Sequence, residues 1–275
     1  MVSSDPAPSW SPEQYLRFEG PRSRPLRDLL AAVPDLPGGP APRVADLGCG
    51  TGNSTAALAA RWPGARLTGY DNSPDMLARA RRREGTEEYG DRLDFVHADL
   101  DDWCPPDGER FDLIASNAAF QWVPEHRARF ARWLTALTDG GVLAFQVPGN
   151  FRAPSHTTLS TLCVAPRWRA RLGDLAVRPN TVAEPVDYAA DLERLGCDVD
   201  VWETTYQHLL PGPDAVLEWV KGTALRPALS RLEGDEEARD AFLAEYRSAL
   251  ADAYPATERG TRFPFRRVFV VAVKR

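Results

Sequence analysis

The chain lacks several features that would mark it as secreted, membrane-bound or metal-binding. It has only four cysteines in 275 residues, and Cys49, Cys104, Cys163 and Cys197 follow no paired spacing. This scatter argues against a disulfide framework and a zinc site, so we expect no metal. No basic region followed by an apolar run opens the sequence, and no apolar stretch approaches the roughly 20 residues that span a bilayer. We therefore expect a cytoplasmic protein with reduced thiols and no membrane partner.

An excess of positive charge is also missing. The 33 lysines and arginines are outnumbered by 39 acidic residues, which leaves a net charge of −6. Such a chain has no long-range attraction for nucleic acid, and we expect no nucleic-acid partner. A small anionic substrate stays compatible with this charge, because a pocket can be locally basic. The length and the 43% hydrophobic share fit one large α/β domain, with or without an inserted subdomain.

The first half of the chain contains short apolar strands that alternate with helices. The pattern predicts strands at 43–47, 65–70, 93–97, 111–116 and 142–147, with helices at 53–62, from Ser73 onward, and at about 125–137. This alternation predicts a parallel, doubly wound sheet. Right-handed crossovers then place the carboxyl ends of the strands at one edge. The residues expected at that edge are Gly48, Asp71, Asp99 and Asn117.

The second half is less regular. We expect helical insertions at about 150–185 and 212–255, separated by a helix at 186–195 and a strand at 197–208. The apolar run at 268–273 predicts a buried closing strand. The resulting domain prediction is an N-terminal lid or helical segment over residues 1–40, followed by one main domain over residues 41–275.

A glycine-rich loop follows the first predicted strand. Gly48, Gly50 and Gly52 are spaced as G-x-G-x-G, which allows a tight turn and close approach of a ligand to the backbone at a helix N-terminus. A dinucleotide site would need G-x-G-x-x-G, but Asn53 stands at the third glycine position. A phosphate-binding Walker loop is excluded, since no Gly-Lys-Ser/Thr follows.

The run DLGCGTG from Asp46 to Gly52 resembles motif I of the class I methyltransferases. This resemblance implies a Rossmann-like class I methyltransferase sheet and S-adenosyl-L-methionine as cofactor, with the loop packed against its methionine part. Asp71 is placed to accept hydrogen bonds from the ribose hydroxyls. Asp99 matches the family's contact to the adenine amino group. The alternative interpretation is that Asp71 and Asp99 are merely solvated carboxylates at strand ends.

Further cofactor contacts follow from their positions. Met76 can offer an apolar, polarizable face to the adenine ring, and Leu100 a backbone amide beside Asp99. The segment with Tyr15, Phe18 and Arg22 is expected to close over the cofactor as a lid, or to form an amphipathic helix packed on the sheet, and both can hold. The cofactor-binding candidates are Tyr15, Arg22, Asp46, Gly48, Cys49, Gly50, Asn53, Asp71, Asn72, Met76, Asp99, Leu100 and Asn117.

Beyond motif I, the chain resembles the trans-aconitate 2-methyltransferases over nearly all of its length. The resemblance rests on the segments Tyr15–Pro25, Ser116–Pro124, Gln146–Asn150 with Pro154–His156, Val201–His208 and Phe263–Phe269. It implies methyl transfer to one carboxylate of a small unsaturated tricarboxylate, which gives a methyl ester and S-adenosylhomocysteine.

A tricarboxylate carries up to three negative charges, so its pocket needs several fixed donors. Arginine suits this task because its planar fork binds carboxylates bidentately and stays charged. Alternation along a strand lets only one of Arg266 and Arg267 point toward the pocket, and the other is expected at the surface. The alternative interpretation of Trp122 is that it belongs to the hydrophobic core and has no contact with the substrate. The substrate-binding candidates are Arg24, Gln121, Trp122, Arg152, His156, Tyr206, His208, Arg266 and Arg267.

We expect no general acid or base, because an ionised carboxylate is already a nucleophile. The expected route is in-line displacement, promoted by orientation and by removal of water. Two alternatives stay open: a methyltransferase for another small acid or natural product, and a non-catalytic S-adenosylmethionine-binding protein. A dinucleotide oxidoreductase is disfavoured by the glycine spacing and by Asp99. The expected oligomeric state is a monomer or a weak homodimer.

Overall fold

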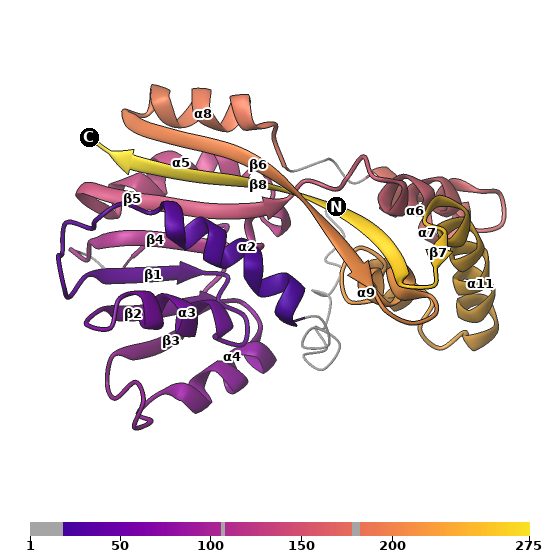
Figure 1. Ribbon diagram of the computed structural model, residues 1–275, viewed down its shortest axis with the longest axis horizontal. Helices are drawn as coiled ribbons and strands as arrows, with labels where there is room; N and C mark the ends of the chain where they lie inside the picture. The colour runs from indigo at the N-terminus through magenta and orange to yellow at the C-terminus, as the bar shows by residue number, and fades with distance from the viewer. Residues whose placement is uncertain (1–18, 106–107, 178–181) are drawn as a thin grey trace. The chain divides into compact units, whose positions relative to one another are not determined.

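A single sheet organises the protein. The computed structural model describes residues 19–105, 108–177 and 182–275, and within them eight strands form a sheet in the order β3-β2-β1-β4-β5-β8-β6, with β7 paired to β8 (Figure 1). The pairs from β3 to β5 are parallel, and β8 runs antiparallel to β5. The strands are β1 Arg43–Leu47, β2 Arg66–Asp71, β3 Leu93–His97, β4 Phe111–Asn117, β5 Leu137–Pro148, β6 Cys197–Leu210, β7 Ala256–Thr257 and β8 Gly260–Lys274.

Helices cover both faces of the parallel part, as the sequence predicted. Figure 1 shows α2 and α3 in front of the sheet and α5 behind it. Phe130 of α5 and Tyr188 of α8 pack against Phe145 of β5, with ring centroids 5.6 and 5.3 Å from it. These helices of the sheet are α2 Glu19–Ala32, α3 Asn53–Arg61, α4 Pro74–Ala80, α5 His126–Thr135 and α8 Pro185–Arg194, with short 3₁₀ turns η1 Arg81–Arg83 and η2 Phe120–Trp122.

Local signals set several boundaries correctly, and tertiary pairing moved others. Ser73 caps α4 through a hydrogen bond from Met76 N to its Oγ, and Pro74 opens the helix as predicted. The fifth strand, in contrast, begins at Leu137 and not at Val142. Leu137 pairs with Phe111 before a shift in register that precedes Val142. The Gly-rich residues between them are therefore part of a bulged strand.

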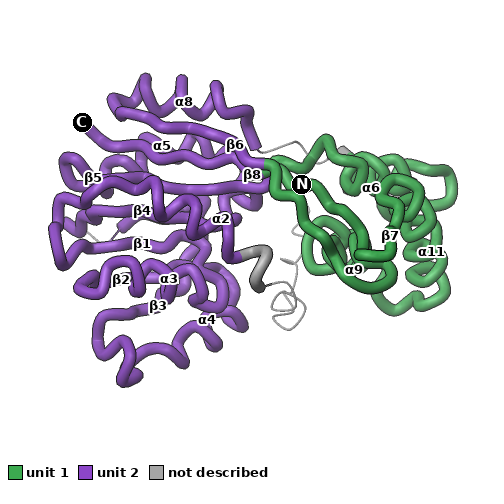
Figure 2. The backbone as a smooth tube through the Cα atoms, in the orientation of Figure 1, with its two compact units in different colours: residues 1–19, 149–180, 205–266 green, residues 20–148, 181–204, 267–275 purple. Residues whose placement is uncertain are grey.

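The chain divides into two compact units (Figure 2). The sheet unit takes in residues 20–148, 181–204 and 267–275, and the helical unit takes in residues 149–180 and 205–266. The long strands β6 and β8 each contribute residues to both. The helical unit contains α6 Pro154–Val164, α7 Arg169–Leu172, η3 Gly173–Val177, α9 Ala215–Lys221, α10 Arg226–Arg231 and α11 Glu236–Ala253.

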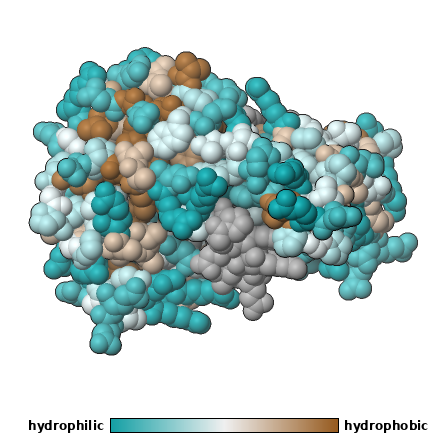
Figure 3. All heavy atoms as spheres, viewed as in Figure 1, coloured by the Kyte–Doolittle hydropathy of each residue, from teal (hydrophilic) through white to brown (hydrophobic). Residues whose placement is uncertain are grey.

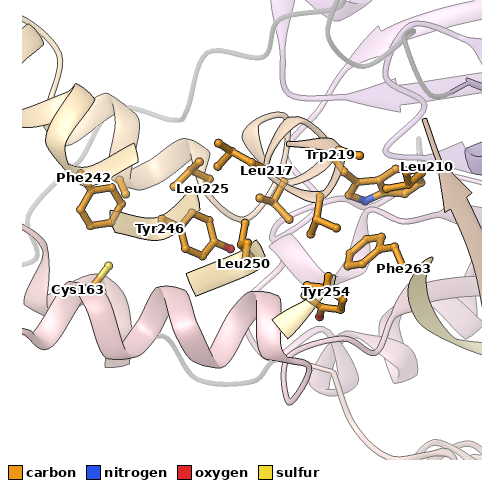
Figure 4. Packing of buried hydrophobic residues seen from close by; sticks show 14 of the residues in the cluster. Cys163, Leu210, Leu217, Trp219, Leu225, Phe242, Tyr246, Leu250, Tyr254 and Phe263 are labelled. Carbon is orange, nitrogen blue, oxygen red and sulfur yellow. The ribbon is translucent and has the colours of Figure 1, made fainter. Parts of the chain in front are cut away.

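The helical unit has its own hydrophobic core. Trp219, Phe242, Tyr246 and Phe263 are nearly or fully buried there, and Figure 4 shows them packed among leucines of the same cluster. Tyr246 also donates a hydrogen bond from its hydroxyl to the carbonyl of Ser155, which ties α11 to α6. This unit is therefore a second folded body with aromatic packing of its own.

The surface is mainly hydrophilic in the view of Figure 3, with apolar residues gathered over α8. Val186 and Leu195, at the two ends of that helix, are 72% and 42% exposed. Across the described residues, no helix is both long and apolar enough to cross a membrane.

Candidate active site

The glycine loop connects the end of β1 to the start of α3. Gly48, Gly50 and Gly52 all have positive φ angles, of 77°, 56° and 79°, which side chains other than glycine rarely adopt. A Cβ at Gly48 would lie 2.2 Å from the Cβ of Ala119, so this glycine allows the loop to pack on the residues after β4. A Cβ at Gly50 would meet no atom within 4 Å among the described residues. Gly50 thus presents bare backbone to open space.

Asp46 is buried directly below this loop. Its Oδ2 accepts hydrogen bonds from Ser54 Oγ at 2.7 Å and from Thr55 Oγ1 at 2.6 Å, both at the start of α3. Its Oδ1 is buried and has no hydrogen-bond partner in the part of the chain that the structure describes. Burial raises the pKa of this carboxyl to about 6, against the lowering effect of the two hydroxyls. Asp46 thus offers one unsatisfied acceptor beside the loop.

Asp71 stands at the carboxyl end of β2 and braces the same loop. Its Oδ2 accepts from Gly50 N and its Oδ1 from Ser73 N, each at 2.9 Å. Desolvation raises the pKa of this carboxyl, and the two backbone hydrogen bonds oppose that shift. Each carboxylate oxygen can accept more than one hydrogen bond, so Asp71 can hold the loop and still bind a hydroxyl.

Cys49 has its side chain turned into the protein. It is 4% exposed, and its Sγ lies close to Gly69 of β2. The backbone N–H groups of Gly48 and Cys49 both donate to the carbonyl of Tyr70. Burial raises the pKa of the Cys49 thiol well above its ordinary value, so it stays protonated.

The next candidates lie on α3, on α4 and just after strands β2 and β3. Asn53 begins α3, and its Oδ1 accepts from Arg83 Nη2 at 2.8 Å. Asn72 is exposed just after Asp71, whereas Met76 of α4 is 7% exposed. Beyond β3, Asp99 is exposed and Leu100 is buried. The Cδ1 atom of Leu100 would lie 3.7 Å from a Cβ at Gly48, which places Leu100 beside the loop.

Asn117 at the end of β4 is hydrogen-bonded to Gln146, which was not among the candidates from the sequence. Gln146 of β5 donates from its Nε2 to Asn117 Oδ1 at 2.5 Å. Arg267 of β8 donates from its Nη1 to Gln146 Oε1 at 3.0 Å. Gln146 is a single polar residue in the apolar run VLAFQV, and that contrast was the available signal.

The structure buries Arg267 and leaves Arg266 partly exposed, so the two arginines differ in burial as the alternation along the strand predicted. Arg267 is only 7% exposed and bonded to Gln146, and Arg266 is partly buried. Arg266 donates its backbone N–H to Asn150 Oδ1, and its side chain passes over Gly149. The antiparallel pairing of β8 with β5 places Arg267 opposite Pro148, and it is this pairing that determines which of the two arginines is buried.

The other substrate-side candidates of the sheet unit are close to the surface or bonded locally. Arg24 is exposed on α2 and lies 3.8 Å from Asp28. Gln121 donates from its Nε2 to the carbonyl of Ala118. Trp122 is 42% exposed, which contradicts its alternative interpretation as a core residue.

The helical unit holds the remaining candidates. Arg152 is exposed, and His156 lies 5.5 Å from Phe151 between ring centroids. Burial lowers the pKa of His156 to about 4, so this imidazole is neutral at pH 7. Tyr206 is buried and stacks on His208 with ring centroids 6.1 Å apart. Tyr15 and Phe18 lie outside the described residues, and Arg22 is described only as part of the α2 backbone.

Comparison with known proteins shows the family to which this chain belongs. A family model described as a methyltransferase domain matches residues 44–141. A trans-aconitate 2-methyltransferase from Streptomyces coelicolor is 57% identical over 98% of this chain and 88% of its own length. The chain belongs to the trans-aconitate 2-methyltransferase family. The similarity extends over nearly the full length of the chain, because a second member, from Streptomyces avermitilis, is 57% identical over 97% of both chains.

The fold agrees with this family. The crystal structure of the YcgJ protein from Bacillus subtilis superposes with a TM-score of 0.59 at 16% identity, and covers 92% of this chain and 98% of its own. This likeness supports the Rossmann-like class I methyltransferase fold that the sequence predicted. The protein is a methyltransferase, and its cofactor is S-adenosyl-L-methionine. The unsatisfied oxygen of Asp46 and the open backbone at Gly50 fit a ligand that carries an ammonium group.

Proposed function

We propose that this protein transfers the methyl group of S-adenosylmethionine to a carboxylate of trans-aconitate or a similar small polycarboxylate. The products are a methyl ester and S-adenosylhomocysteine. The observation that carries the proposal is the 57% identity to trans-aconitate 2-methyltransferases over almost the whole chain, substrate side included. A likeness confined to the glycine loop would support only the cofactor.

Each residue of the sheet unit has a proposed role toward the cofactor. S-adenosylmethionine, when bound, supplies a methyl group made electrophilic by a positive sulfonium. Asp46 holds a negative charge beside the loop through its unsatisfied oxygen, which suits an ammonium group. Asp71 accepts hydrogen bonds from ribose hydroxyls while it braces Gly50. Asn72, Met76, Asp99 and Leu100 complete the proposed binding site on the adenosine side.

The acceptor needs no general base from this protein. A carboxylate is ionised at neutral pH and can attack directly, so the residues act by orientation and by exclusion of water. Arg152 and Arg266 are proposed to hold carboxylates of the acceptor as bidentate donors. His156 is neutral, so its proposed contribution is a hydrogen bond without charge.

The cellular setting belongs to the same proposal. We propose a cytoplasmic enzyme that acts on a small molecule, binds no nucleic acid and is a monomer or a weak homodimer. The net charge of −6 supports the absence of a nucleic-acid substrate.

The deciding experiment incubates the purified protein with methyl-labelled S-adenosylmethionine and one acid at a time: trans-aconitate, cis-aconitate, isocitrate or citrate. Mass spectrometry follows the ester. Preferential methylation of trans-aconitate is the expected result. If S-adenosylmethionine binds but none of the four acids is methylated, the acceptor assignment is wrong and another small acid takes its place. Binding without turnover of any acceptor would favour a non-catalytic S-adenosylmethionine-binding protein.

A further inference from the structure

Three neighbouring strands of the sheet unit bring together three polar side chains that are far apart in the sequence. Asn117 of β4 pairs with Gln146 of β5 in the strand register, and Arg267 of β8 pairs with Pro148, two residues beyond Gln146. Since side chains alternate along a strand, all three lie on the same face of the sheet. Two hydrogen bonds join them, from Arg267 to Gln146 and from Gln146 to Asn117.

The chemistry of arginine fixes the direction of both bonds. A guanidinium only donates hydrogen bonds, so the Gln146 atom that faces Arg267 must be its oxygen. The NH₂ group of Gln146 must then face Asn117, and the Asn117 atom that receives it must be its oxygen. The usual ambiguity between oxygen and nitrogen in amide side chains is thereby removed at both residues. Gln146 is 1% exposed and Arg267 is 7% exposed, so water does not compete for these positions.

Asn117 lies next to the glycine loop. It ends β4, which pairs with β1, and Ala119 two residues later touches the position where Gly48 has no Cβ. Because its oxygen faces Gln146, the NH₂ group of Asn117 faces away from Gln146 and can donate its two N–H groups to a ligand.

We propose that Gln146 and Arg267 are positioning residues that orient the Asn117 amide so that its NH₂ group binds a carboxylate oxygen at the methyl-transfer site. That oxygen belongs either to the methionine part of the cofactor or to the acceptor, and the two sources share the same chemistry. If the oxygen belongs to the acceptor, the proposal rests on the proposed function. If it belongs to the cofactor, it does not.

The substitution Gln146→Glu tests this chain of hydrogen bonds from Arg267 through Gln146 to Asn117. It keeps the shape of the side chain but replaces the NH₂ donor that faces Asn117 by an acceptor. The introduced carboxylate would pair with Arg267, but both of its oxygens only accept. Asn117 would have to turn its NH₂ group toward this carboxylate and present its oxygen to the ligand. We expect one of two results: at least a tenfold rise in the Kd for S-adenosylmethionine, measured by calorimetry, or at least a tenfold fall in kcat/KM for the acceptor. A change in Kd assigns the oxygen to the cofactor, and a rise in acceptor KM at unchanged Kd assigns it to the acceptor.

A double-mutant cycle separates positioning from simple damage. In the Asn117→Ala background the amide is gone, so Gln146→Glu is expected to change Kd and kcat/KM less than threefold. Equal losses in both backgrounds, or no loss in either, would overturn the proposal. Ala131→Glu is the charge control, because it adds one negative charge at an exposed position of α5.

A second variant serves if Gln146→Glu does not fold. Asn117→Asp leaves Arg267 and Gln146 intact and replaces the NH₂ group by an anionic oxygen, so we again expect at least a tenfold rise in Kd or at least a tenfold fall in kcat/KM. Unchanged Kd and kcat/KM in this variant would contradict the proposal. Failure of the proposed function has a different signature, since no acid would be methylated while the Kd for S-adenosylmethionine could still be measured in every variant.

Discussion

The two sides of the glycine loop are built in different ways. On the β2 side, Asp71 bonds to Gly50 across 21 residues of chain, and Asp46 bonds to Ser54 and Thr55 across 8 and 9 residues. On the β5 side, Gln146 reaches Asn117 across 29 residues, and Arg267 reaches Gln146 across 121.

The residues on the β2 side form a recognisable sequence motif, whereas those on the β5 side do not. A strand, its loop and the next helix form a contiguous unit whose spacing is constrained by local geometry, so Asp46 and the glycines appear as a pattern. The relay of Asn117, Gln146 and Arg267 exists only once β8 has inserted beside β5. Substitutions on each side can test this contrast.

The largest effect is expected where the two sides touch. Gly48→Ala forces a Cβ to 2.2 Å from Ala119 at a φ of +77°, and overpacking together with left-handed backbone strain should cost about 3 kcal/mol or more of unfolding free energy. Gly50→Ala is the matched control, because it has the strain without the contact and should cost about 1–2 kcal/mol. Denaturant unfolding of both variants measures the difference. Equal losses would mean that the loop and the β4 end are not tightly packed.

The next largest effect concerns cofactor affinity. Asp71→Ala removes the carboxylate that binds Gly50 N and Ser73 N, together with its proposed contact to the ribose. Hydrogen bonds to a charged group contribute about 1.5–3 kcal/mol, so the Kd for S-adenosylmethionine should rise about 100-fold in calorimetry. Asp75→Ala, at an exposed position of α4, is expected to leave the Kd almost unchanged. A similar Kd for both variants would remove Asp71 from the cofactor site.

The Asp46 carboxylate is expected to lower the stability of the folded protein at pH 7 while it strengthens the binding of S-adenosylmethionine. Its folded pKa of about 6 lies above the ordinary pKa of an aspartate, which is about 3.9. The folded state therefore holds the extra proton between about pH 4 and pH 6, and stability falls as pH rises through that window. Asp46→Asn avoids the buried charge and should raise the unfolding free energy at pH 7 by up to about 3 kcal/mol. The same variant should bind S-adenosylmethionine more weakly.

Thermal unfolding at several pH values measures the effect on stability, and calorimetry at pH 7 measures the affinity for S-adenosylmethionine. In the Asp46→Asn variant the slope of stability between about pH 4 and pH 6 should be smaller than in the parent protein. A variant that is less stable than the parent at pH 7 would show that the carboxylate is satisfied in the folded protein.

The smallest effect is expected from Arg267→Lys. Lysine keeps the positive charge and can still donate one hydrogen bond to Gln146, but it loses the planar fork. We expect about a tenfold loss or less in the parameter that Gln146→Glu affects, equal to about 1.4 kcal/mol. Steady-state kinetics and calorimetry decide the size. A loss larger than that of Gln146→Glu would indicate a direct role of Arg267 in binding.

Periodicity and spacing in the sequence are sufficient to predict the parallel sheet and the glycine loop after its first strand. The contacts of that loop and of the neighbouring strand ends to the cofactor stay a prediction. Alternating apolar runs predicted β1 to β4 almost to the residue, since the burial of parallel strands on both faces leaves a clear pattern. The spacing from Asp46 to Gly52 was sufficient to predict the glycine loop, because the geometry of the loop depends on residues that are close in the sequence.

The hydrogen bonds of Arg267 and Gln146 and the division into two units follow from the folded arrangement and could not be predicted from the sequence. The sequence left open which of Arg266 and Arg267 is buried, and the antiparallel pairing of β8 with β5 places Arg267 in the interior against Gln146. The helical unit likewise joins segments 149–180 and 205–266 around one aromatic core. Contacts of this kind depend on which distant segments pack together, and that choice leaves no fixed spacing in the sequence.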